Sequence, residues 1–247
     1  MSLILCSFII FIFSADKKLF ATPVNVAGDT SKILNTGSMW NGFEYGRPGE
    51  YSEYFDTFSQ YVAGDWTITT TEGGTGDATE ALSASISGNA LVITNDNTTG
   101  DKDSLQRVGT IFTPTASKNI YCEFKVKTSE ATTSDYLVGL VVTDTTPLTH
   151  TDGIAFRKDT GDTNWDFFTT NTSSASTDTG IATANTADYF KLGVKVTGTT
   201  LVEYYVDDSK KGSFATNIPT SALRPTLYNA GISTALTVKH IHCTQEE

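Results

Sequence analysis

The chain has 247 residues, of which 38% are hydrophobic and 18% are charged, and its formal net charge is −11. A chain of this composition folds around an apolar core, because disordered chains combine low hydrophobicity with high net charge. The acidic surplus argues against a nucleic-acid partner, since phosphate binding needs clustered Lys and Arg. The three basic groupings are small and are interpreted as solvated surface: Lys17-Lys18, Lys125 with Lys127, and Lys210-Lys211.

The N-terminal segment contains an apolar run from Leu3 to Phe13. This run is shorter than the ~20 residues of a membrane-spanning helix, so we expect no membrane partner. It has the length of a signal-peptide core, but no Lys or Arg precedes it and Lys17-Lys18 follow it. The alternatives are an apolar arm that docks on a neighbouring subunit and a start codon placed too early, with Met39 as a candidate for the true start. We expect a leader and extended arm over residues 1–53 and one folded domain over residues 54–247.

The body of the chain consists of short alternating segments separated by turn residues, which is typical of an antiparallel sandwich or barrel. Apolar residues alternate with polar ones over 120–126 and again over 190–196, so one side of each strand is buried. No segment longer than about ten residues has the apolar stripe of a helix. The other expected strands are 54–58, 66–70, 90–94, 108–112, 137–143, 154–158, 165–169, 201–206, 212–216, 226–232 and 236–242.

The number and even spacing of these strands predict an all-β fold, an antiparallel two-sheet jelly roll of the concanavalin A-like lectin and glucanase type. An immunoglobulin-like sandwich is disfavoured because its Cys…Trp…Cys arrangement is absent. Val202, Tyr204 and Val206, followed by Asp207-Asp208, indicate a hairpin near the end of the domain. We expect the last strand, over 236–243, to return beside the first.

A fold of this type raises the question of glycoside hydrolysis, which in retaining enzymes needs two carboxyl groups about 5 to 5.5 Å apart. The pattern E-x-D-x-x-E supplies them from one strand, but no Glu, Glu123 and Glu203 included, is followed two residues later by Asp. No G-x-S-x-G motif, phosphate loop or dinucleotide fingerprint is present. We therefore expect no enzyme activity, no catalytic residues and no cofactor. The alternative is a glucanase whose two carboxylates come from separate strands and converge in a cleft.

Two histidines near the C-terminus have a spacing that allows both rings to bind one metal ion. On a strand, His240 and His242 point to one side, but a site needs a third ligand, which His150 or an Asp would have to supply. We interpret the pair as ordinary polar residues of the last strand and predict no metal site.

The segment from Asn95 to Gln106 has oxygen-bearing side chains at alternate positions and Gly100 at the sixth, as in a calcium loop. Asn95 and Gln106 stand where such loops carry charged ligands, so two charges are lost. We interpret the segment as a turn rich in Asn, Asp and Gly. The alternative is Ca²⁺ held by this loop together with Asp144 or Asp152.

Four aromatic residues are candidates for stacking on sugar rings, although large aromatics mostly fill cores. Trp165 follows a hairpin turn and is the better candidate, whereas Trp66 enters a strand and is interpreted as structural; the others are Tyr189 and Tyr205.

The three cysteines have no CxxC spacing and cannot all pair. Cys122 lies on the apolar side of its strand, where a free thiol behaves as a small buried hydrophobe. A disulfide between Cys122 and Cys243 requires two strands to bring the Cα atoms within about 7 Å. The cysteines therefore do not decide whether the protein works in an oxidising or a reducing compartment.

A series of motifs in the body carries a family resemblance. These are Y-F-D-T-F-S-Q-Y-V-A-G-D-W-T (54–67), L-V-I-T-N-D (91–96), G-L-V-V-T-D-T-T-P-L (139–148), D-G-I-A-F-R-K-D (152–159), V-E-Y-Y-V-D-D (202–208) and the terminal T-V-K-H-I-H-C-T-Q-E-E. Taken together they resemble structural proteins of tailed bacteriophages. The resemblance implies a non-enzymatic virion protein, a capsid decoration or minor structural component, whose partners are capsid or tail proteins. The alternative is a lectin-like module, secreted or virion-borne, that holds host surface glycans.

Overall fold

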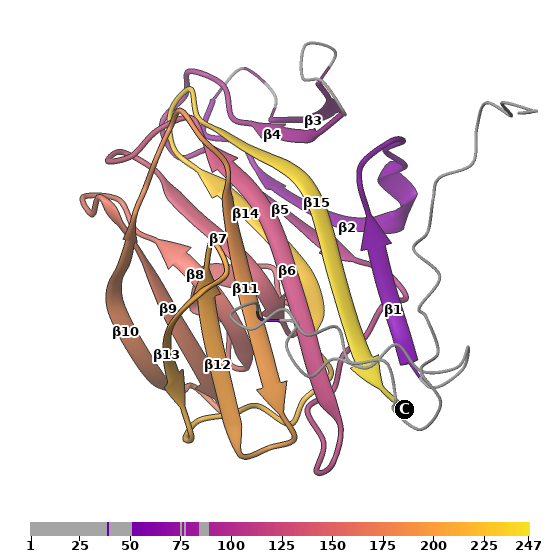
Figure 1. The fold of residues 1–247 in the computed structure, drawn as a ribbon. Coiled ribbons are helices and arrows are strands. Elements are labelled where there is room, and N and C mark those ends of the chain that lie inside the picture. The colour runs from indigo at the N-terminus through magenta and orange to yellow at the C-terminus, as the bar shows by residue number, and fades with distance from the viewer. Residues whose placement is uncertain (1–38, 40–50, 75, 77, 84–88) are drawn as a thin grey trace, which may run out of the picture.

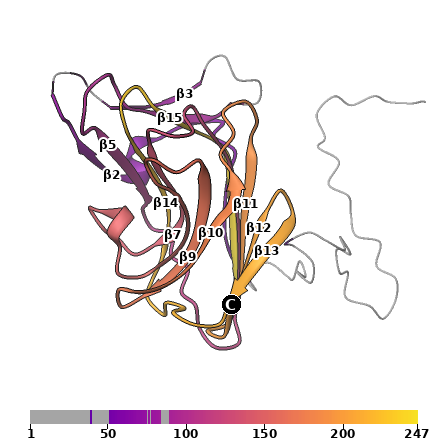
Figure 2. The same cartoon turned by 90° about the vertical axis from the view of Figure 1, so that its left-hand side faces the viewer.

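The computed structural model describes residues 39, 51–74, 76, 78–83 and 89–247, which fold into two stacked antiparallel sheets (Figure 1). One sheet has eight strands in the order β13-β12-β11-β6-β15-β4-β3, with β1 paired to β15 as the eighth. The other has seven strands in the order β10-β9-β8-β7-β14-β5-β2. The two layers are seen edge-on in Figure 2. The predicted two-sheet sandwich is therefore confirmed.

The strands of the eight-stranded sheet are β1 (Tyr51–Asp56), β3 (Thr79–Leu82), β4 (Leu91–Thr94), β6 (Asn119–Thr128), β11 (Phe190–Thr197), β12 (Leu201–Val206), β13 (Ser209–Phe214) and β15 (Ala235–Glu246). Those of the seven-stranded sheet are β2 (Trp66–Thr71), β5 (Lys102–Arg107), β7 (Asp135–Val141), β8 (Gly153–Lys158), β9 (Asn164–Asn171), β10 (Ser174–Thr183) and β14 (Arg224–Ala230). Two 3-10 turns, η1 (Ala63–Asp65) and η2 (Pro147–Thr149), are the helical elements of the described residues. Within that part of the chain no helix has the length and apolar character needed to cross a membrane.

The main core lies between the two sheets. Ile120, Cys122, Phe124 and Val126 point inward from β6, as their alternation predicts, and all four are buried. Apolar side chains of β7 and β8 meet them from the other sheet. Burial of these two inner faces is the dominant stabilising term of such a sandwich.

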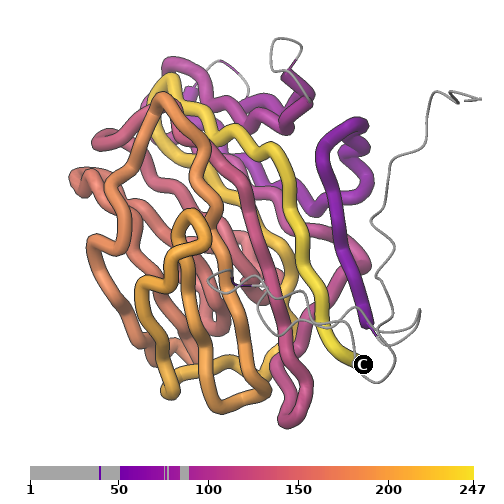
Figure 3. The backbone as a smooth tube through the Cα atoms, viewed as in Figure 1, coloured from indigo at the N-terminus to yellow at the C-terminus, as the bar shows by residue number. Residues whose placement is uncertain are grey.

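The two ends of the domain lie together, as predicted. β15 pairs with β1 in the register Tyr54↔Cys243, and Figure 3 shows the yellow last strand running beside the indigo first strand. The predicted late hairpin is β12–β13, and its turn residues Asp207 and Asp208 have φ of 48° and 64°. Positive φ at both central residues is the geometry of a tight two-residue hairpin turn, and Asp tolerates it better than most residues.

Three strands are missing from the sequence prediction, and one predicted strand is wrong. β3, β5 and β10 were not predicted as strands, whereas residues 108–112 contain only an isolated bridge from Phe112 to Leu223. β5 reads K-D-S-L-Q-R and β10 is rich in Ser and Thr, so neither carries the apolar alternation on which the prediction depended. The predicted leader and arm lie outside the described residues, apart from Met39 and Tyr51 to Glu53.

Cys122 and Cys243 form a disulfide, so the interpretation of Cys122 as a free thiol is wrong. The two residues are directly opposite in the β6–β15 ladder, and their Cα atoms are 4.1 Å apart. The bond joins residues separated by 121 positions in the sequence. Only the strand pairing reveals this proximity.

Candidate functional site

A line of side chains crosses the outer face of the eight-stranded sheet. The ladders place Phe55 opposite His242, His242 opposite Glu123, Glu123 opposite Gly193, and Gly193 opposite Tyr205. Residues that face each other in neighbouring strands share one side of a sheet. The sequence neighbours of these five residues point into the core, so the five positions face away from it; the neighbours are Tyr54, Ile241, Cys122, Leu192 and Tyr204. We call them the outer row.

Two imidazole–carboxylate pairs lie along this row. Nε2 of His242 is 2.8 Å from Oε1 of Glu53, and Nε2 of His240 is 2.8 Å from Oε1 of Glu123. Glu53 comes from β1 and Glu123 from β6, so the two carboxylates flank β15 from opposite sides. The pairs place hydrogen-bond donors and acceptors side by side on one face.

Phe55 provides an exposed apolar surface at one end of the row. Its side chain is 59% exposed, and its ring contacts that of His242 edge-on at 5.0 Å between centroids. A single exposed apolar side chain is ordinary on a protein surface, so Phe55 is of interest because it lies beside the Glu53–His242 pair.

The other end of the row is closed by Tyr205 and by a residue from the segment before β1. Tyr205 is buried, and burial together with Glu203 raises the pKa of its hydroxyl to about 12. Gly193 leaves a hollow in the sheet face, and Met39 fills it: a Cβ on Gly193 would lie 2.6 Å from Sδ of Met39. Exposure is therefore greatest at the Phe55 end of the row and falls to 12% for the side chain of Glu123.

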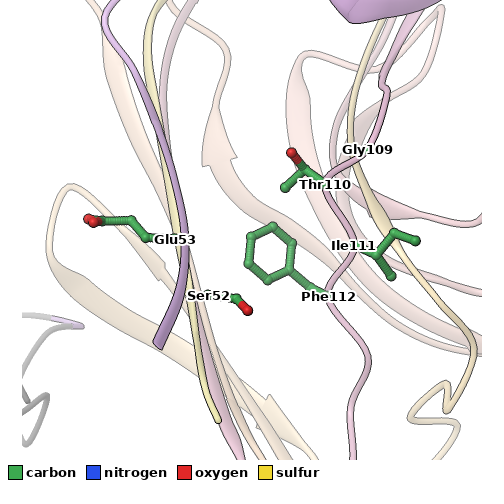
Figure 4. Close-up of a pocket in the computed structure, with 6 residues that line it drawn as sticks. All are labelled: Ser52, Glu53, Gly109, Thr110, Ile111 and Phe112. Atoms are coloured by element: carbon green, nitrogen blue, oxygen red, sulfur yellow. The ribbon is translucent and has the colours of Figure 1, made fainter. Parts of the chain in front are cut away.

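A depression of about 320 Å³ lies next to Glu53, between β1 and the segment Gly109 to Phe112 (Figure 4). Ser52 and Phe112 point into the gap, whereas Glu53 points to the opposite side of β1. The depression therefore flanks the edge strand of the outer row.

The outer face of the seven-stranded sheet is filled by the protein itself. Leu137, Val141, Ala155, Phe168, Tyr228 and Ala230 form a second apolar cluster there. The segment around η2 contributes Leu148 to this cluster and lies on the side of the sheet away from the main core (Figure 2). His150 stacks on Phe168 with 5.0 Å between ring centroids, and its Nδ1 donates a hydrogen bond to the main-chain oxygen of Pro147. Burial lowers the pKa of His150.

The three histidines considered as metal ligands are not brought together. His150 lies over the seven-stranded sheet, whereas His240 and His242 lie on the other sheet and bind carboxylates. Within the described part of the chain, no three His, Cys, Asp or Glu side chains are grouped so that they could hold a metal ion.

The candidate calcium loop is divided between a turn and a strand. β5 begins at Lys102, and Gln106, further along it, accepts a hydrogen bond from the main-chain N–H of Asp144. Five strand residues, about 17 Å, separate Gln106 from Asp101. Oδ1 of Asp152 accepts a hydrogen bond from the main-chain N–H of Thr172 at another turn. Asp144 and Asp152 therefore do not join the loop.

The aromatic candidates are mostly structural. Trp165 is 0% exposed and packs against Tyr136 in the core, so its prediction as a sugar platform is wrong. Trp66 is buried, as expected. Tyr189 is half-buried, with the Nζ atoms of Lys127 and Lys239 at 5.4 and 5.5 Å from its ring centroid.

The fold has counterparts among solved structures, although no protein-family model and no curated protein matches the chain. An endo-1,3-β-glucanase from Streptomyces sioyaensis has a TM-score of 0.57 at 12% identity, covering 82% of this chain and 99% of its own. The carbohydrate recognition domain of Emp47p has 0.55 at 12% identity, covering 80% and 98%. The β-glucanase of Bacillus licheniformis has 0.56 at 12% identity, covering 77% and 96%. The fold is a concanavalin A-like jelly roll, one that glucanases and carbohydrate recognition domains share.

These comparisons correct the expectation that the chain is not an enzyme. Structures with this fold include endo-glucanases, so the missing E-x-D-x-x-E pattern is no ground for excluding activity. The expectation gave most weight to the pattern that supplies both carboxylates from one strand and little to carboxylates from separate strands. In this chain Glu53 and Glu123 come from different strands and are brought to one face by sheet pairing. Their outward position could be read from the alternation with Tyr54 and Cys122, but their proximity could not.

Proposed function

We propose that this domain binds carbohydrate on the outer face of the eight-stranded sheet, between Phe55 and Glu123. The supporting observation is an exposed phenyl ring directly beside the Glu53–His242 pair, in a fold that carbohydrate recognition domains and glucanases adopt. An apolar ring face suits the C–H face of a sugar, while carboxylate and imidazole groups exchange hydrogen bonds with hydroxyls. β-Glucan oligosaccharides are the first ligands to test, because several of the similar structures are β-glucanases.

Isothermal titration calorimetry of the purified chain with β-1,3- and mixed-linkage glucan oligosaccharides tests this proposal. We expect Phe55→Ala to weaken binding about tenfold, the factor that 1.4 kcal/mol represents. Glu53→Gln should weaken it as well, because the variant loses the charged acceptor beside His242. Ile232→Ala is the matched control, since Ile232 is 46% exposed on a turn away from this face. Binding that survives Phe55→Ala and Glu53→Gln unchanged would exclude the outer row.

Glycoside hydrolysis is a second candidate function, favoured by the two carboxylates that flank β15. Two strand spacings across the sheet and a two-residue offset along it separate Glu53 from Glu123, roughly 12 Å between their backbones, which is nearer to the carboxyl separation of inverting enzymes, about 6.5–9.5 Å, than to that of retaining ones. Reducing-sugar release from β-glucan, with the product anomer followed by NMR, tests it. Glu53→Gln and Glu123→Gln should each abolish release of an inverted product. Turnover that persists in both variants would remove this candidate.

We further propose that the protein acts outside the reducing cytosol, as a secreted or virion-borne module. The buried Cys122–Cys243 disulfide supports this location, because such bonds persist in oxidising compartments. The virion location depends on the bacteriophage resemblance, and the similar structures named above are not virion proteins. Mass spectrometry of purified particles tests it, and absence of the chain from them would leave secretion.

A further inference from the structure

Acidic side chains gather at the end of the sandwich where β2 leads to β3 and β4 leads to β5. The side-chain carboxyl groups of Asp96 and Asp101 lie within interaction distance of each other. The negative charge of Glu72 lies close enough to Asp101 and Asp103 to raise the pKa of both. Glu80 is hydrogen-bonded to Asp103. No ion pair found among the described residues includes any of these five acids. Among the residues that the structure describes, no basic side chain therefore forms an ion pair with the cluster.

Buried oxygen atoms in this region lack hydrogen-bond partners. Asp101 and Asn95 are each only 1% exposed, yet Oδ2 of Asp101 and Oδ1 of Asn95 have no partner, and the same holds for Oδ1 of Asp96. The amide of Asn95 is held beside the loop, because its Nδ2 donates to the main-chain oxygen of Asp101 at 3.1 Å. A buried carboxylate oxygen without a donor is costly, and in native proteins such oxygens usually bind water or an ion.

Two glycine-bearing loops pack closely around these oxygens. A Cβ on Gly76 would lie 1.4 Å from Oδ2 of Asp96, and one on Gly73 would lie 2.0 Å from the main-chain oxygen of Thr99. The N–H of Gly73 also donates to Oδ1 of Asp101 at 2.7 Å. The absence of side chains at these glycines thus lets the backbone approach the carboxylates.

We propose that these two loops form a calcium site with Asp96 and Asp101 as its charged ligands. Two carboxylates in contact repel each other unless a proton or a cation lies between them. Among the described residues, only the carboxylates of Asp96 and Asp101 meet here, so the site is not one of those in which three acidic side chains hold the ion. Ca²⁺ takes six to eight oxygens in a flexible geometry and completes its shell with amide, main-chain and water oxygens, such as Oδ1 of Asn95. Mg²⁺ needs a near-ideal octahedron and is disfavoured at such an irregular site.

Thermal unfolding of the purified full-length chain in EDTA, CaCl₂ or MgCl₂ tests the proposal. A ligand that binds only the folded state raises Tm, and at a hundredfold excess over Kd the rise for a domain of this size is about 5–10 °C. We expect this rise with CaCl₂ and a smaller one with MgCl₂. Equal Tm values in CaCl₂ and EDTA would overturn the site.

Two variants separate a calcium site from a purely structural role. Asp96→Asn and Asp101→Asn should lose the calcium-dependent rise in Tm and keep or exceed the wild-type Tm in EDTA, because each removes the repulsion between the carboxylates. Asp188→Asn, on an exposed loop elsewhere, is the control and should keep the full rise. If Asp101→Asn instead lowers Tm equally in CaCl₂ and EDTA, the carboxylate serves only to accept the Gly73 N–H, and the proposal is wrong.

Discussion

Reduction of the Cys122–Cys243 disulfide should cost the domain a large part of its stability. The bond spans 121 residues. The chain-entropy relation, with ΔS of about −2.1 − 1.5R ln n in cal/mol/K, gives about 5 kcal/mol at 25 °C for a loop of this length. Measured values are commonly lower, about 2–4 kcal/mol, because reduced chains retain structure. We therefore expect reduction to lower the free energy of unfolding by about 3–5 kcal/mol.

Guanidinium unfolding of the oxidised and reduced protein measures this difference. The double variant Cys122→Ala/Cys243→Ala is the control, because its stability should not respond to reductant. Peptide mapping without reduction should recover the peptides of Cys122 and Cys243 linked together. A change below about 1 kcal/mol on reduction, or unlinked peptides from the native protein, would refute the reasoning.

Two further predictions concern the seven-stranded sheet. A Cβ on Gly139 would lie 2.5 Å from Cα of Ala155 and from the main-chain oxygen of Ile154, so Gly139→Ala should destabilise the domain by about 1–3 kcal/mol in urea unfolding. Gly64→Ala, where nothing lies within 4 Å, should stay within about 0.5 kcal/mol, and equal effects of the two variants would contradict the packing. Burial holds the pKa of His150 below its usual 6.5, so the unfolded chain takes up a proton first as pH falls, and stability from this residue is lost below about pH 6.5. His150→Phe should therefore lose less stability than the wild type between pH 7 and pH 5, and parallel losses would show that His150 is not responsible.

The fold was predictable from the sequence because most strands bury one side. The alternation around Cys122 and around Leu192 placed the right side chains in the core, and the turn residues after Val206 marked the hairpin. Strands without that signal were missed: β10 is an edge strand with mostly polar side chains, and β5 buries polar residues such as Asp103, Ser104 and Gln106.

The candidate site depends on pairings that no local pattern encodes. Glu53 and His242 are 189 positions apart in the sequence, and Glu123 and His240 are 117 apart. Period-two alternation predicts which side of its strand each residue takes, but strand order and register decide which residues become neighbours. Trp165 shows that sheet packing also decides burial. Its place just after a turn suggested exposure, but the facing sheet buries it.

The central claim is that sugar binds on the outer face of the eight-stranded sheet, and amide NMR shifts during titration with a β-glucan oligosaccharide test it most directly. The account predicts that perturbations concentrate on β1, β15 and β6 around Phe55, His242 and Glu123, and that they disappear in Phe55→Ala. Perturbations centred on Phe168 and η2, or none at saturating oligosaccharide, would contradict it.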